Sequence, residues 1–154
     1  MPSCANTAGA AGTAGALPRG PGTYVLVLRL ADARQCPVGS LGRQAFPGGW
    51  YLYVGSALSG LAGRVGRHQR VNAAGAAPRP HWHIDALLAH AALRQIWYRQ
   101  GAERCECSWA AALAALPGVR PHVGGFGASD CRCPTHLFHC GERPQVAWLE
   151  AAVG

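Results

Sequence analysis

Residues 48–68 read GGWYLYVGSALSGLAGRVGRH, and this stretch joins two kinds of secondary structure. Its first half, from Trp50 to Ser56, is rich in tyrosine and other large apolar residues, as buried strands are. Ser59 then predicts the start of a helix that runs to about Val71. A strand that leads directly into a helix bearing arginines indicates a domain that mixes strands and helices.

The same patterns predict further elements on both sides of this stretch. Residues 23–30, TYVLVLRL, form an apolar strand, so the chain is expected to open with an antiparallel meander. The other expected elements are a short strand between turns within 31–48, helices over 81–91 and 103–116, and strands over 93–99 and 135–139. Together they predict an α+β domain, with a small and mostly antiparallel central sheet flanked by helices.

The length of the chain, 154 residues, suits one domain with a substantial core. Residues 1–20 are small and bury little, so we expect a disordered tail there. The domain is expected to span 21–143. Residues 144–154 are expected to form a C-terminal tail or a short helix.

The charge of the chain favours an anionic partner. Its fourteen basic residues are all arginine, against seven acidic residues, for a net charge of +7. Nucleic acid is the first expectation and an anionic membrane surface the second. No stretch approaches the roughly 20 apolar residues that span a bilayer, and no secretory signal is visible. We therefore expect a cytoplasmic protein with reduced cysteines and no membrane partner.

The predicted helix after Ser59 places a cation at the edge of its apolar stripe. At about 100° per residue, Val65 and His68 fall beside Leu61, and Arg64 lies at the margin. Arg64 and His68 are also i,i+4 neighbours. This position suits an active-site cation, although periodicity alone favours a solvated basic face with the His68 ring packed inside.

A carboxylate falls on the apolar stripe of the predicted helix over 103–116. Glu106 shares this stripe with Trp109 and Leu113. A carboxylate in such a place must be paired, protonated or bound to a metal, because burying it alone costs several kcal/mol. Mg²⁺ accepts oxygen ligands and needs few from the protein. A magnesium ligand and an ion pair with an arginine both remain open.

The order of these features resembles the GIY-YIG nuclease superfamily. Residues 22–24 (GTY) and 53–55 (YVG) are similar to the two halves of its signature, separated here by the extra segment 31–48. Arg64 matches the catalytic arginine of that family, and Glu106 its metal-binding glutamate. The motifs GTYVL, YLYVGSA, HWHIDALL and FGASDCRCPTHLF resemble an uncharacterised branch whose domains also occur fused to a DNA-repair endonuclease.

The resemblance implies a metal-dependent endonuclease that hydrolyses phosphodiester bonds in DNA, including branched or damaged DNA. It implies that Glu106 holds Mg²⁺ or Mn²⁺ and that Arg64 contacts phosphate oxygens. Tyr24 or a metal-bound water would take a proton, assisted by hydrogen bonds from Tyr53 and His68. A DNA-repair protein is a further expected partner. The alternative is a nucleic-acid-binding module that keeps the fold without cleaving.

Five more residues are candidate substrate contacts: Gly55, Arg67, Trp82, His83 and Asp85. Gly55 would let the backbone approach the substrate, and Trp82 could stack on a base. The structural alternative for the HWHID segment is a helix start, with its aspartate near the positive end of the helix dipole.

The cysteines suggest a second kind of site less strongly. Cys131-x-Cys133-x-x-His136 resembles a metal-binding segment, and Cys105 or Cys107 could complete it. However, the C-x-C spacing departs from the usual spacing of zinc ligands. Buried structural thiols are therefore favoured over zinc, and a zinc-stabilised interaction domain is the third functional alternative.

Overall fold

The computed structural model describes residues 17–77, 79, 82–128, 131–145 and 147. Within them the chain forms the following elements in order: β1 (Gly22–Leu30), β2 (Arg34–Pro37), the 3-10 helix η1 (Gly39–Leu41), β3 (Arg43–Phe46), β4 (Gly49–Ala57), α1 (Leu61–Ala74), α2 (Ile84–Leu88), β5 (Ala92–Gln100), α3 (Glu106–Ala114), β6 (Val119–Pro121) and β7 (Leu137–Cys140). No helix in this described part is long and apolar enough to cross a membrane.

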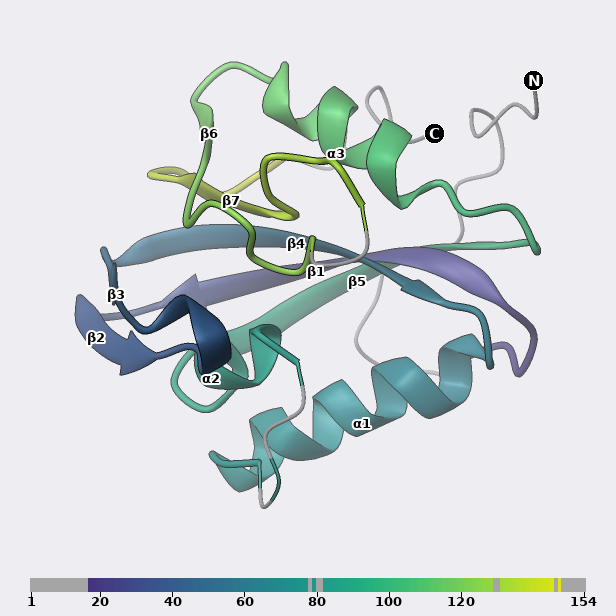
Figure 1. Ribbon diagram of the computed structural model, residues 1–154, viewed down its shortest axis with the longest axis horizontal. Coiled ribbons are helices and arrows are strands. Elements are labelled where there is room, and N and C mark those ends of the chain that lie inside the picture. Colours follow the sequence, from purple (N-terminus) through teal and green to yellow (C-terminus); the bar gives the residue numbers. More distant parts are fainter. Residues whose placement is uncertain (1–16, 78, 80–81, 129–130, 146, 148–154) are drawn as a thin grey trace.

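The main sheet has five strands in the order β5-β1-β4-β7-β6, and every neighbouring pair is antiparallel. Helices α1 and α2 cover one face together with the β2–β3 hairpin, and α3 covers the other (Figure 1). The predicted α+β fold with a small antiparallel sheet flanked by helices is confirmed.

The interior strand β1, between β5 and β4, is buried on both faces, which explains its nearly unbroken apolar sequence. Tyr24, Leu26 and Leu28 belong to the core on the side of α1 and α2. Val25 and Val27 belong to a second core against α3. Because side chains alternate along a strand, β1 connects the two helical layers.

Residues 31–48 do not add a strand to the main sheet, so the predicted opening meander is wrong. β2 and β3 pair only with each other, as a separate two-stranded sheet. The extra segment therefore leaves β1 and β4 free to pair directly, with Tyr24 opposite Gly55 and Leu26 opposite Tyr53. This register places the Tyr24 and Tyr53 rings on one face, with their centroids 6.4 Å apart.

The start of α1 depends on residues that we expected in the N-terminal tail. The N-cap is Gly60 rather than Ser59, and it makes no side-chain cap hydrogen bond. Instead the Leu61 N–H donates to the Gly20 carbonyl, and the Ala62 N–H donates to the Pro18 carbonyl. Residues 17–20 thus belong with the fold, whereas the rest of the expected tail, 1–16, lies outside the described residues, as does most of 144–154.

The apolar stripes predicted for the two longer helices are confirmed. In α1 the buried residues are Leu61, Val65, His68 and Val71. In α3 they are Glu106, Trp109, Ala110 and Leu113. Both helices are bounded differently from the predictions, and α2 is much shorter than the helix expected over 81–91.

Candidate active site

A cavity of about 310 Å³ opens where β1, β4, α1 and the start of α3 meet. Its walls bring together segments far apart in the sequence, including both tyrosine motifs. The lining residues are Tyr24, Tyr53, Gly55, Ser56, Leu58, Arg64, Trp82, His83, Arg104, Glu106 and Gly127. Of the ten predicted site residues, seven lie in this lining; His68, Arg67 and Asp85 do not.

The GTY tripeptide of β1 ties both helical layers to this cavity. The Thr23 hydroxyl accepts a hydrogen bond from the Cys105 N–H at 3.2 Å, immediately before α3. The next side chain points to the opposite face, where the Tyr24 hydroxyl lies 2.7 Å from Nε2 of His68 on α1. Successive residues of one strand therefore position the two helices that carry Glu106 and Arg64.

Gly55 leaves the space that the Tyr24 ring occupies. The two residues are paired across β1 and β4, and a Cβ built on Gly55 would lie 2.4 Å from both Cζ and the hydroxyl oxygen of Tyr24. No side chain fits there without displacing the tyrosine. Gly55 thus serves the site by close packing against Tyr24.

Burial keeps both partners of the Tyr24–His68 hydrogen bond uncharged at neutral pH. Desolvation, with a smaller effect of Tyr53, raises the pKa of Tyr24 well above 10, and Arg64 opposes this only in part. Desolvation also lowers the pKa of His68 from 6.5 to about 4. At neutral pH Tyr24 therefore keeps its proton, and the imidazole keeps one unprotonated nitrogen that can accept a hydrogen bond.

The low pKa of His68 predicts that the folded protein loses stability in acid because His68 becomes protonated on unfolding. The unfolded chain takes up the proton near pH 6.5 and the folded chain only near pH 4, so the stabilisation is complete above pH 6.5 and is lost as the pH falls to 4. The loss should be about 3 kcal/mol in the free energy of unfolding. Urea unfolding at pH 7, 5.5 and 4.5 should show a shallower pH dependence for His68→Gln, and equal slopes would contradict the assignment.

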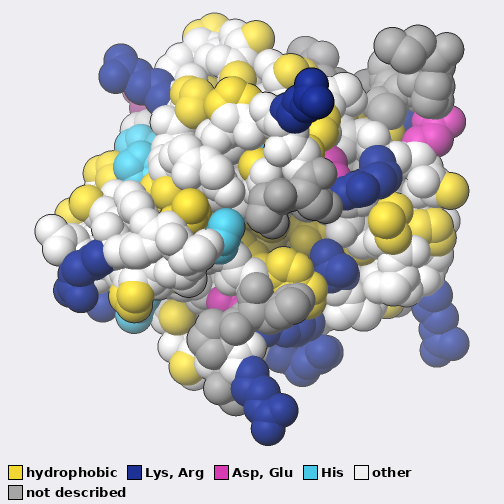
Figure 2. All heavy atoms as spheres, viewed as in Figure 1, with side chains coloured by type: hydrophobic (Ala, Val, Ile, Leu, Met, Phe, Trp, Pro, Cys, Tyr) yellow, Lys and Arg dark blue, Asp and Glu magenta, His cyan; other side chains and the backbone are white. Residues whose placement is uncertain are grey.

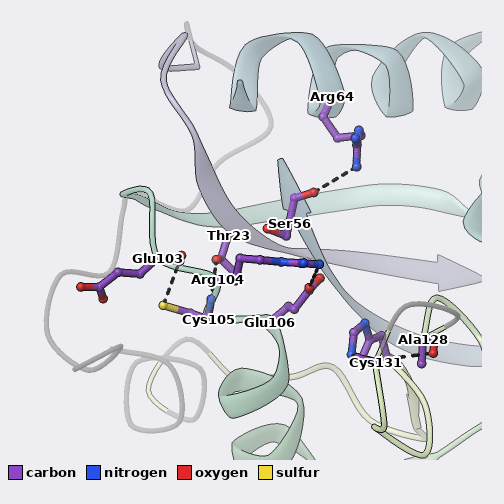
Figure 3. A network of polar contacts seen from close by, with 10 residues as sticks. Thr23, Ser56, Arg64, Glu103, Arg104, Cys105, Glu106, Ala128 and Cys131 are labelled. Carbon is purple, nitrogen blue, oxygen red and sulfur yellow. Dashed lines mark hydrogen bonds and ion pairs between the residues drawn. The ribbon is translucent and has the colours of Figure 1, made fainter. Parts of the chain in front are cut away.

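Arg64 is held at the edge of the cavity by two contacts. Its Nη1 donates to the Ser56 carbonyl at 3.0 Å (Figure 3), and its guanidinium lies 4.4 Å from the centre of the Trp82 ring. Both contacts leave part of the planar cation facing the cavity that it lines. The position predicted from the helical wheel, at the margin of the buried stripe, agrees with this geometry.

Arg67 and Asp85 support Trp82 instead of lining the cavity. The Arg67 guanidinium forms a two-pronged ion pair with Asp85, at 2.7 and 3.0 Å, and packs 4.4 Å from the Trp82 ring centre. Asp85 is 2% exposed and also accepts the Trp82 N–H at 3.2 Å. Of the three residues, only Trp82 lines the cavity.

A loop before β7 closes the other side of the cavity. Gly127 donates its backbone N–H to Nδ1 of His83 at 2.9 Å. With a φ of +67°, Gly127 has a left-handed conformation, and a Cβ there would lie 2.9 Å from Cε1 of Tyr53. Gly127 was not predicted as a site residue, although its place in the glycine-rich GGFG segment was a signal for such a turn.

Glu106 lies in the first turn of α3, and it is the only carboxylate among the described residues that line the cavity. Its side chain is 9% exposed, and Oε1 forms an ion pair with Arg104 Nη2 at 2.5 Å (Figure 3). The ion pair anticipated for Glu106 is thus present, although the sequence did not identify Arg104 as the partner.

The part of the cavity lined by Glu106 suits a hard divalent cation. A carboxylate on a polar cavity is the kind of ligand that Mg²⁺ takes, with water and substrate oxygens completing the coordination. Arg104 is 46% exposed, so the ion pair is open to solvent on its arginine side. Glu106 is thus the carboxylate of the described cavity lining that could hold such an ion.

The relationship of the chain to known proteins rests on one match. No curated protein and no solved structure matches it. A family model described as a domain of unknown function, DUF123, matches residues 23–153. This range contains all the described residues that line the cavity. The chain therefore belongs to the DUF123 family.

Proposed function

We propose that this cavity is the active site of a metal-dependent, GIY-YIG-type endonuclease that hydrolyses phosphodiester bonds in DNA, branched or damaged DNA included. One observation carries the proposal. Tyr24, Tyr53, Arg64 and Glu106, which come from four separate elements, line the same cavity. Their side chains supply hydroxyl, guanidinium and carboxylate groups, the groups that phosphodiester hydrolysis requires.

Arg64 supplies the positive charge for the phosphate. Its guanidinium matches two non-bridging oxygens of a phosphodiester, and its contacts with Ser56 and Trp82 hold it in place before the substrate arrives. Because the cation is already positioned, it stabilises the charge that develops in the transition state without further reorganisation.

Tyr24 and His68 form a route for the proton of the attacking water. Tyr24 keeps its proton at neutral pH, so it does not act as a resting phenolate. Instead the water passes a proton to the Tyr24 oxygen while the Tyr24 proton moves to Nε2 of His68, 2.7 Å away. No net charge is created on Tyr24 in this exchange. His68 is a weak base, so the route requires a water that is already acidified.

Glu106 would hold the Mg²⁺ or Mn²⁺ of the reaction. A bound divalent cation neutralises charge on the phosphate and makes a coordinated water more acidic. Arg104, whose side chain is 46% exposed, would then contact the DNA backbone near the cavity.

The surroundings of the cavity favour a nucleic-acid substrate. Trp82 lines the cavity and lies between two arginines, an arrangement that suits stacking on an unpaired base. On the face drawn in Figure 2, basic side chains are prominent and acidic ones sparse, in accord with the net charge of +7. We place this activity in the cytoplasm, in association with DNA-repair proteins.

Cleavage assays with two matched arginine variants test this function. Labelled single-stranded, duplex, flap and four-way DNA would be incubated with Mg²⁺ or Mn²⁺. We expect Arg64→Ala to lower the cleavage rate by about 10²–10³-fold, because it removes a preorganised transition-state contact. Arg70→Ala should change the rate little, since Arg70 is exposed on the same helix and lies outside the lining.

Two outcomes would count against the proposal. Cleavage that is equally fast in wild type and Arg64→Ala would place the reaction elsewhere. Salt-sensitive DNA binding without cleavage in either metal would favour the non-catalytic binding module instead.

A further inference from the structure

We propose that Cys107, Cys131, Cys133 and His136 bind a structural zinc ion beside the candidate active site. One sulfur or nitrogen atom from each residue lies within 4.8 Å of all the others. Four ligands at about 2.3 Å from a tetrahedral zinc lie about 3.8 Å from one another. Sγ of Cys131 and Nε2 of His136 are already 3.4 Å apart. Small side-chain rotations would therefore complete the coordination.

The kind of ligand selects the metal. Three thiols and an imidazole are soft to intermediate donors, which favour Zn²⁺ over the hard Mg²⁺ expected at Glu106. Four protein ligands leave no open position for water or substrate, as in structural rather than catalytic zinc sites. The proposal is thus independent of the nuclease proposal and concerns a different ion.

The fold supplies the ligand that the local spacing lacks. Cys131 and Cys133 are too close in sequence for a usual zinc pair, but the topology brings Cys107 to them from the first turn of α3. Cys105, the other cysteine considered for this role, is disulfide-bonded and is not part of the cluster, so the expectation of reduced cysteines is wrong at this position. Its backbone N–H instead bonds to Thr23.

The backbone holds the most buried ligand in place. His136 is 0% exposed, its N–H donates to the Phe126 carbonyl at 2.8 Å, and its carbonyl accepts the Val54 N–H at 3.0 Å. The Cys131 N–H donates to the Ala128 carbonyl at 3.4 Å. Two ligand backbones are therefore fixed without the metal, which lowers the entropic cost of binding it.

Such an ion would join the parts that shape the candidate active site. Cys107 follows Glu106 directly on α3, and the loop that carries Cys131 and Cys133 also contains Gly127, which packs against Tyr53. In Figure 1 this loop runs beside α3, on the same side of the sheet. The zinc would tie the loop to the start of α3 and so hold opposite walls of the cavity together.

Metal analysis of the full chain tests the proposal. Protein purified under reducing conditions, without added metal or chelator, should contain one zinc per chain by mass spectrometry. Replacement by Co²⁺ should give the intense thiolate-to-cobalt absorption of a tetrahedral site with several sulfurs. Competition with a chromogenic zinc chelator would then give the affinity of each variant.

Cys107→Ser is the informative variant, because Cys107 is exposed and its loss leaves the core intact. Loss of a residue that only hydrogen-bonds to a metal ligand weakens metal binding by about 10–100-fold. Cys107→Ser removes a ligand itself, so it should weaken zinc binding by more than that. Cys36→Ser, which removes a free thiol outside the cluster, should bind zinc as the wild type does. Wild-type protein without zinc and without the cobalt spectrum, or unchanged affinity in Cys107→Ser, would overturn the proposal.

Discussion

Replacing Glu106 by glutamine is expected to slow DNA cleavage by about 10³-fold at a Mg²⁺ concentration that just saturates the wild type. The amide keeps the size of the side chain but removes the charge that would hold the cation, whose contribution to the transition state is several kcal/mol. The loss should be smaller when Mg²⁺ is raised, because part of it is weaker metal binding. Single-turnover rates over a range of Mg²⁺ concentrations measure both effects.

Glu103→Gln is the matched control for this experiment. Glu103 is exposed, lies three residues before Glu106 and does not line the cavity. Its replacement removes the same charge from the same region and should leave the rate within about twofold, since exposed charges are screened by salt. A similar loss in both variants would mean that net charge, and not a metal ligand, is responsible.

Gly55→Ala is expected to destabilise the fold and impair cleavage together. The new methyl group would lie 2.4 Å from the Tyr24 ring, which is buried and hydrogen-bonded to His68. Overpacking of this kind costs about 1–3 kcal/mol in the free energy of unfolding. Because Tyr24 must shift away from His68, the cleavage rate should fall even at temperatures where the variant is folded.

Gly63→Ala is the matched control, and we expect it to stabilise the fold rather than destabilise it. Gly63 lies on the exposed side of α1, and a Cβ there would meet nothing within 4 Å. The substitution should raise the free energy of unfolding by about 0.5–1 kcal/mol, since alanine favours helix over glycine. Urea unfolding of both variants gives the comparison, and a stable, fully active Gly55→Ala protein would contradict the packing described for Tyr24.

The periodic parts of this fold could be predicted from the sequence. Alternation and the 3.6-residue repeat depend only on local geometry, so the buried stripes of α1 and α3 were predicted correctly, down to His68 and Glu106. The pairing partner of β1 could not be predicted in this way. Whether 31–48 joins the main sheet or folds apart depends on long-range packing.

The site was predictable where a side chain bears the chemistry and not where the backbone does. Ser56 acts through its carbonyl and Gly127 through its N–H, and neither group is specific to a residue type. Arg104 pairs with Glu106, only two residues away, whereas the partners of Cys107 in the cluster come from a distant loop. Arg67 and Asp85 were predicted to contact the substrate, but in the structure they form an ion pair beside Trp82.

The most direct test of the central claim, that Arg64 and Glu106 act on one phosphodiester, is a double-mutant cycle. Single-turnover cleavage would be measured for wild type, Arg64→Ala, Glu106→Gln and the protein with both changes. If both residues serve one transition state, the double variant should be about as slow as the slower single variant. Effects that multiply fully, or a wild type that binds DNA and never cleaves it with either metal, would contradict a shared catalytic site.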